Sequence, residues 1–78
     1  MKISRDVGGE ELAKLLMRYG YKITRQTGSH LRMTDEQGHH VTIPKHGSLK
    51  VGTLNNILND IACHLQMDKQ MLVRELFY

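Results

Sequence analysis

His30 and Arg32 stand two positions apart, directly after Gly28 and Ser29, and they carry the clearest chemistry in the chain. An imidazole titrates near neutral pH, so it can take a proton from the 2′-hydroxyl of RNA or deliver one to a departing 5′-oxygen. A guanidinium on the same side of a strand can bind the phosphate under attack. Gly28 would let the substrate approach the backbone closely. An exposed strand histidine is more often a plain surface residue, so RNA cleavage is only a hypothesis on this evidence.

The remaining histidines are weaker candidates. His46 follows Lys45 in a loop, where it could assist catalysis or bind phosphate, or only shape the loop through local hydrogen bonds. His39 and His40 are adjacent and therefore point to opposite sides of a strand, while His64 belongs to a helical segment. No pair of histidines has metal-site spacing with a third ligand, so the sequence predicts no metal and no cofactor.

The distribution of charge favours a polyanionic or acidic partner. The chain has 11 Lys and Arg against 8 Asp and Glu, a net charge of +3, which is also common in proteins that bind neither kind of partner. Between residues 12 and 59, however, the only acidic residues are Asp35 and Glu36. The basic residues of this stretch are Lys14, Arg18, Lys22, Arg25, Arg32, Lys45 and Lys50. Such a region suits RNA or an acidic protein surface.

The length limits what kind of site can exist. With 78 residues the chain is expected to form one domain over residues 1–78, and it buries only about 60 to 65% of its unfolded surface. A large enclosed active site is excluded, so any catalysis would act on a polymer or large partner at an open surface. No apolar run approaches the roughly 18 residues that span a membrane, and the N-terminal residues do not read as a signal peptide. We expect a cytoplasmic protein, with its single cysteine, Cys63, as buried filler.

Helical periodicity marks the first element that must position these residues. Apolar side chains recur at spacings of three and four, which predicts a helix that opens at Gly8 or Gly9, ends at Gly20 and presents Leu12, Leu15, Leu16 and Tyr19 on one face.

The period then changes to two, which predicts three short antiparallel strands. Residues 35–38 form the loop of a hairpin, and Pro44 ends the last strand. One face of this sheet is apolar, and the other carries Lys22, Thr24, His30, Arg32, Thr34, His40 and Thr42.

A second helical stripe follows at Leu54, Ile57, Leu58, Ile61 and Leu65, and a short last helix should begin at Asp68 and use Met71, Leu72 and Leu76. The predicted class is α+β: a three-stranded antiparallel sheet with its helices on one face, in the order α-β-β-β-α plus a short C-terminal helix. The expected core is Leu15, Leu16, Ile23, Leu31, Met33, Val41, Ile43, Leu54, Ile57, Leu58 and Ile61.

Three ordered sequence blocks lie on these elements. They read RQTGSH at residues 25–30, VTIPKH at 41–46 and GTLNNIL at 52–58, after a leading EELAKLLMRYGYK. Over roughly residues 8 to 66 the chain resembles the HicA family, toxin endoribonucleases of toxin-antitoxin modules. Many relatives have a second histidine after the GSH block. Here Leu31 stands in that place, and its predicted core position makes the change harmless.

The resemblance implies a fold like the double-stranded RNA-binding domain and a toxin that cleaves mRNA without a metal, with His30 as the catalytic residue. It also implies a HicB-like antitoxin as protein partner. The residues expected to hold RNA are Lys22, Arg32, Lys45, His46 and Lys50. A non-catalytic RNA-binding module of the same fold and a purely protein-binding domain are the alternatives. The role of residues 67–78 is left open.

Overall fold

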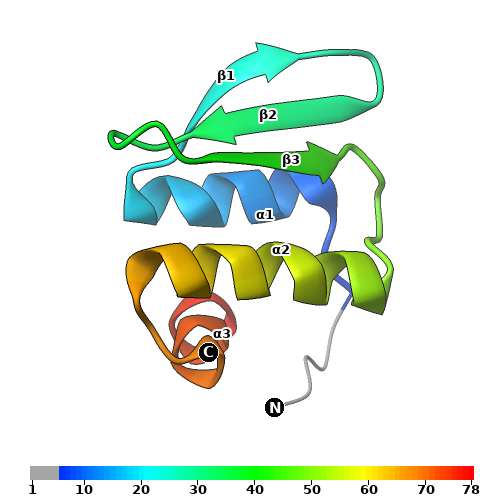
Figure 1. The fold of residues 1–78 in the computed structure, drawn as a ribbon. Coiled ribbons are helices and arrows are strands. Elements are labelled where there is room, and N and C mark those ends of the chain that lie inside the picture. Colours follow the sequence, from blue (N-terminus) through cyan, green and yellow to red (C-terminus); the bar gives the residue numbers. More distant parts are fainter. Residues whose placement is uncertain (1–5) are drawn as a thin grey trace.

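The structure is a computed structural model, and it describes residues 6–78. The elements are α1 (Gly9–Leu16), the 3₁₀ turn η1 (Met17–Tyr19), β1 (Lys22–Gln26), β2 (His30–Thr34), β3 (His40–Pro44), α2 (Val51–Leu65) and α3 (Lys69–Phe77). The strands form one antiparallel sheet in the order β1-β2-β3. Helices α1 and α2 lie side by side on one face of this sheet, and α3 packs beyond them (Figure 1). The predicted α+β arrangement is confirmed.

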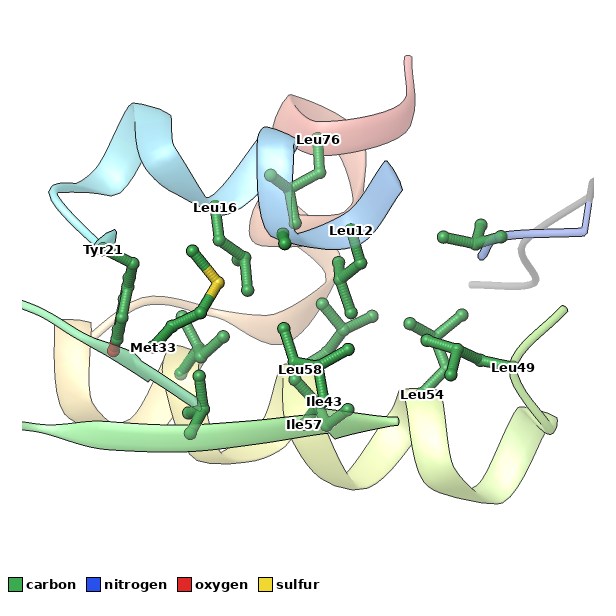
Figure 2. Close-up of a cluster of buried hydrophobic side chains, with 14 of the residues drawn as sticks. Leu12, Leu16, Tyr21, Met33, Ile43, Leu49, Leu54, Ile57, Leu58 and Leu76 are labelled. Atoms are coloured by element: carbon green, nitrogen blue, oxygen red, sulfur yellow. The ribbon is translucent and has the colours of Figure 1, made fainter. Parts of the chain in front are cut away.

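The core lies between the sheet and the helices, as the periodicity predicted (Figure 2). Strands β2 and β3 alternate exposed and buried positions, and Ile43 and Leu58 are both 0% exposed, which confirms the strand and helix registers. Leu15 is only partly buried against this core. Residues outside the predicted set also fill it, namely Val7, Leu12, Ala13, Tyr21, Leu49, Ala62, Leu72, Val73 and Leu76.

The prediction that Ile23 belongs to the core is wrong. This side chain is 40% exposed, and every residue of β1 is exposed. Helices α1 and α2 pack mainly on β2 and β3, so the helix-side face of β1 extends beyond their cover. Ile23 instead lines a shallow hollow together with Met17 of η1.

Helix α3 packs on α2 and adds three buried side chains to the core. The Asp68 carboxylate accepts a hydrogen bond from Gln70 N at 2.9 Å, which confirms the predicted N-cap. Leu72 is buried as predicted, but Met71 is 55% exposed, so its place on the apolar side of this helix is a wrong prediction. The Tyr19 hydroxyl donates to Glu75 at 2.6 Å and joins η1 to α3.

Cys63 is exposed, which contradicts its prediction as buried filler. Its neighbours Ile61 and Ala62 carry the buried stripe of α2, and the next position turns out to solvent.

Backbone contacts join four segments at one end of the molecule (Figure 1). The Gly9 N–H donates to the His46 carbonyl at 2.9 Å, and a Cβ atom on Gly9 would lie 1.9 Å from the Pro44 carbonyl oxygen. Only glycine allows the start of α1 to lie so close to the end of β3. On the other side of β3, the Lys45 N–H donates to the Ser29 carbonyl at 2.9 Å.

Ionisable side chains join the β2–β3 loop to α2 at the opposite end. The rings of His39 and His64 stack with centroids 4.0 Å apart. His64 Nε2 lies 2.6 Å from Asp35 Oδ2, and His39 Nε2 lies 3.2 Å from Asp60 Oδ1. The Tyr21 hydroxyl lies 2.7 Å from His39 Nδ1, and burial, together with the nearby carboxylates, raises the pKa of Tyr21 to about 12. His39 therefore packs on the helix side of the sheet, whereas His40 lies on the opposite face.

Gly9→Ala should lower the free energy of unfolding by about 3 kcal/mol, because the added methyl group meets backbone that cannot rotate away. Urea unfolding measures the effect. Gly47→Ala is the matched control, since a Cβ at that position meets nothing within 4 Å. Equal stability of the two variants would contradict the close approach of α1 to β3.

Asp35→Asn should make the free energy of unfolding fall less steeply as the pH is lowered. Partial burial acts to raise the pKa of Asp35, but the His39 N–H, the His64 ring and the Gln37 N–H outweigh it and hold this pKa below its usual value. The carboxylate therefore stabilises the fold above the unfolded-state pKa, and that contribution is lost as the pH falls through the lower folded-state pKa.

Thermal melts over a series of acidic pH values test this. Asp35 Oδ1 accepts hydrogen bonds from the Gln37 and His39 N–H groups, and Asn keeps a side-chain oxygen that can accept both. The variant therefore tests the charge of the carboxylate. Glu36→Gln, at the exposed neighbouring position, is the control. A melting temperature of Asp35→Asn that declines in acid as steeply as that of the wild type would refute the assignment.

Candidate functional site

His30 is the first residue of β2, and its backbone is fixed by a tight turn. The Thr27 N–H donates to the His30 carbonyl at 3.0 Å, and the His30 N–H donates to Thr27 Oγ1 at 3.1 Å. In the sheet His30 lies opposite Pro44. The backbone is thus held on both sides while the imidazole is exposed, as predicted.

The Ser29 hydroxyl lies 2.9 Å from His30 Nδ1. A hydroxyl can both donate and accept, so it can support either neutral form of the ring. When Nδ1–H donates to Ser29 Oγ, Nε2 has a free lone pair and can take a proton. The resulting imidazolium has an N–H at both nitrogens, so Nδ1–H keeps its bond to Ser29 while Nε2–H donates. The same contact therefore suits both halves of an acid–base cycle.

The predicted polar residues share the open face of the sheet, away from the helices. Arg32 pairs with Thr42 of β3, and Lys22 pairs with Thr34. Arg32 is exposed two residues from His30 on β2. The structure therefore brings His30, Arg32 and Lys22 onto one surface, with His30 at one end and Lys22 at the other.

A ladder of hydrogen bonds crosses this face at the end far from His30. Thr24 Oγ1 lies 2.8 Å from Thr34 Oγ1, which lies 2.7 Å from His40 Nδ1. His40 is thus an exposed second imidazole on the open face, fixed by Thr34 and separated from His30 by the length of β2.

Arg25 also lies on the open face, which alternation along β1 did not predict. The register shifts between Ile23 and Arg25, so that Arg25 pairs with Arg32. Such a β-bulge places one extra residue in a strand and reverses the alternation beyond it. The sequence around Thr24 holds no glycine or proline that would have indicated the bulge.

The loop residues are placed less closely to His30. Lys45 Nζ lies 3.8 Å from Glu10 Oε1, so this side chain is directed toward α1. His46 lines a hollow at the start of α1 that His30 does not line. Lys50 is the exposed N-cap residue of α2. These three residues surround the helix starts rather than the open face.

Residues 9–62 match the family described as HicA toxin of bacterial toxin-antitoxin. The chain belongs to the HicA toxin family. The match includes α1, the whole sheet and most of α2, so it contains His30 and the open face. No match is found among curated proteins or among solved structures. The resemblance seen in the three sequence blocks is therefore confirmed, and the toxin role in a toxin-antitoxin system follows from the family.

Helix α3 lies outside the range that matches the HicA family. In this HicA chain it supplies Leu72, Val73 and Leu76 to the core, which gives the C-terminal residues a structural role.

Two further features of this HicA toxin concern residues 6–78. Within this part of the chain, no three His, Cys, Asp or Glu side chains form a group that could hold a metal ion. No helix in the same range is long and apolar enough to cross a membrane.

Proposed function

We propose that this HicA toxin is a cytoplasmic endoribonuclease that cleaves mRNA without a metal ion, with His30 as general acid or base. The observation that carries the proposal is the exposed His30 imidazole, whose Nδ1 contacts Ser29 and whose strand neighbour on the same face is Arg32. Family membership supports the same activity, since HicA toxins are known as mRNA-cleaving toxins.

The proposed reaction is an attack of the ribose 2′-oxygen on the adjacent phosphorus. His30 Nε2 takes the 2′-hydroxyl proton as the new O–P bond forms. The bond to the 5′-oxygen then breaks, and protonated His30 returns a proton to that oxygen. The products are a 2′,3′-cyclic phosphate and a 5′-hydroxyl, and the imidazole ends in its starting state. Arg32, two residues along the same face, holds the RNA backbone beside the scissile linkage.

Basic side chains would hold the rest of the RNA. Lys22 extends the positive charge along the open face beyond Arg32. Lys45, His46 and Lys50 are proposed as outer contacts near the helix starts, with Lys45 the weakest because Glu10 already partly neutralises it. Binding through phosphates should weaken as the salt concentration rises.

A HicB-like antitoxin is the proposed protein partner. An exposed His30 that shares the open face with Arg32 and Lys22 is a natural target for an acidic surface that blocks RNA access. Cross-linking of the complex tests this. Cross-links confined to α3, away from His30, would contradict direct occlusion.

His30→Ala should abolish RNA cleavage and toxicity, because a positioned acid or base contributes about a hundred to ten thousand fold in rate. The exposed imidazole packs little, so the free energy of unfolding should change by less than about 1 kcal/mol. Cleavage of labelled RNA is followed over time, with and without EDTA, beside thermal melts. His46→Ala should lose less activity, and His40→Ala is the matched control on the same face.

Each part of the proposal has a contrary outcome. Full cleavage by folded His30→Ala would remove His30 from the mechanism, and unfolding of that variant would make the residue structural. Loss of wild-type cleavage in EDTA would refute metal independence. Salt-dependent RNA binding with no cleavage at all would favour a non-catalytic RNA-binding module.

Ser29→Ala should lower kcat about tenfold while changing KM little, because the hydroxyl orients the ring without contacting substrate. Ser29→Thr, which keeps a hydroxyl, should recover part of the rate. An unchanged kcat, or a Ser29→Thr variant no faster than Ser29→Ala, would show that Ser29 is not a positioning residue.

A further inference from the structure

Two arginines face each other across the sheet without an anionic partner among the described residues. Arg25 of β1 pairs with Arg32 of β2, and both are exposed on the open face. Like charges directly opposite each other on neighbouring strands are destabilising. Neither guanidinium takes part in an ion pair within residues 6–78. Asp35, which directly follows β2, is paired with His64 instead.

The bulge in β1 creates this unfavourable pair. Regular alternation from Ile23 would put residue 25 on the helix side, where Ile23 lies, and would leave Arg32 opposite Thr24. The shift between Ile23 and Arg25 places a second guanidinium opposite the first. An anion bound on this face would supply the missing negative charge and relieve the repulsion between the two guanidiniums.

We infer that Arg25 and Arg32 together bind one phosphate of the RNA, next to the scissile phosphate at His30. This inference rests on the proposed ribonuclease function. Side chains from paired positions start about 5 Å apart and project to the same side. Each guanidinium offers a planar set of N–H donors, so the two can bind the two non-bridging oxygens of a phosphodiester.

The spacing along β2 sets the order of contacts. Arg32 lies two residues from His30, which corresponds to about 6.6 Å along a strand. This distance is comparable with that between successive phosphates of an extended RNA strand. When His30 acts on the scissile linkage, the arginine pair is therefore at the neighbouring phosphate, and the RNA runs along β2 from His30 toward Arg32 and the opposite Arg25.

The geometry favours single-stranded RNA over a duplex. Duplex-binding domains of this fold contact about 16 base pairs across two minor grooves and the phosphates between them, whereas His30 and Arg32 lie within one five-residue strand, a span that fits a few nucleotides of a single strand. A single strand can also turn its 2′-hydroxyl into line with the departing oxygen, which a regular A-form helix resists. A single-stranded segment of RNA is the ligand that this surface fits.

The test measures binding of a short single-stranded RNA to a His30→Ala background, so that the ligand survives. Arg25→Ala should weaken binding about tenfold and reduce the slope of log affinity against log salt by about 0.7, the value for one lost phosphate contact. Arg25→Lys keeps the charge but not the planar set of donors, so its affinity should lie between that of the His30→Ala background and that of Arg25→Ala. Arg74→Ala, an exposed arginine of α3, is the control and should bind as tightly as the background.

A double-mutant cycle tests whether the arginines share one phosphate. If they do, Arg25→Ala and Arg32→Ala combined should weaken binding by less than the product of the two separate effects. Multiplicative effects would show two independent contacts and overturn the shared site. Thermal melts should find Arg25→Ala at least as stable as its background, because the like-charge contact is removed.

Failure of this inference can be separated from failure of the proposed function. If wild-type protein cleaves RNA but Arg25→Ala and Arg74→Ala have equal affinities and salt slopes, the phosphate site is wrong and the ribonuclease stands. If wild-type protein does not cleave but Arg25→Ala still loses affinity and slope, the phosphate site stands without the chemistry. An effect of Arg25→Ala only on binding of an acidic protein would overturn the RNA assignment.

Discussion

The contact between the start of α1 and the end of β3 determines where the candidate site lies. Glycine at position 9 lets two backbones touch, and β3 in turn holds the turn that precedes His30 through the Lys45–Ser29 hydrogen bond. The path from the start of α1 to Ser29 thus consists of backbone hydrogen bonds. The side chains of Arg25 and Arg32 are therefore free to serve a ligand, because the position of the His30 backbone does not depend on them.

The two faces of the sheet divide the work of stability and chemistry. The helix-side face buries Leu31, Met33, Val41 and Ile43, while the open face carries the imidazoles and guanidiniums. Because adjacent residues in β2 serve opposite faces, a five-residue strand contributes to both. This separation explains how so small a chain combines a closed core with an exposed cluster of like charges.

Periodicity was enough to predict the elements, the face of Ile43 and the exposure of His30. It failed for Ile23, because a period of two says which face a residue takes but not whether a helix covers that part of the sheet. It failed for Arg25, because the bulge has no glycine or proline to mark it. The stacking of His39 on His64 was beyond sequence reasoning as well, since it depends on how the hairpin loop meets the far end of α2.

The irregularity in β1 also affects how this protein behaves at high concentration. An uncovered edge strand offers free N–H and C=O groups to which a strand of another molecule can add, and this is a common start of aggregation. A bulge disturbs the regular spacing of those groups, and the cationic side chains of Lys22 and Arg25 repel a second copy of the same edge. The feature that distorts the strand thus also keeps that edge of the sheet from acting as a template for self-assembly.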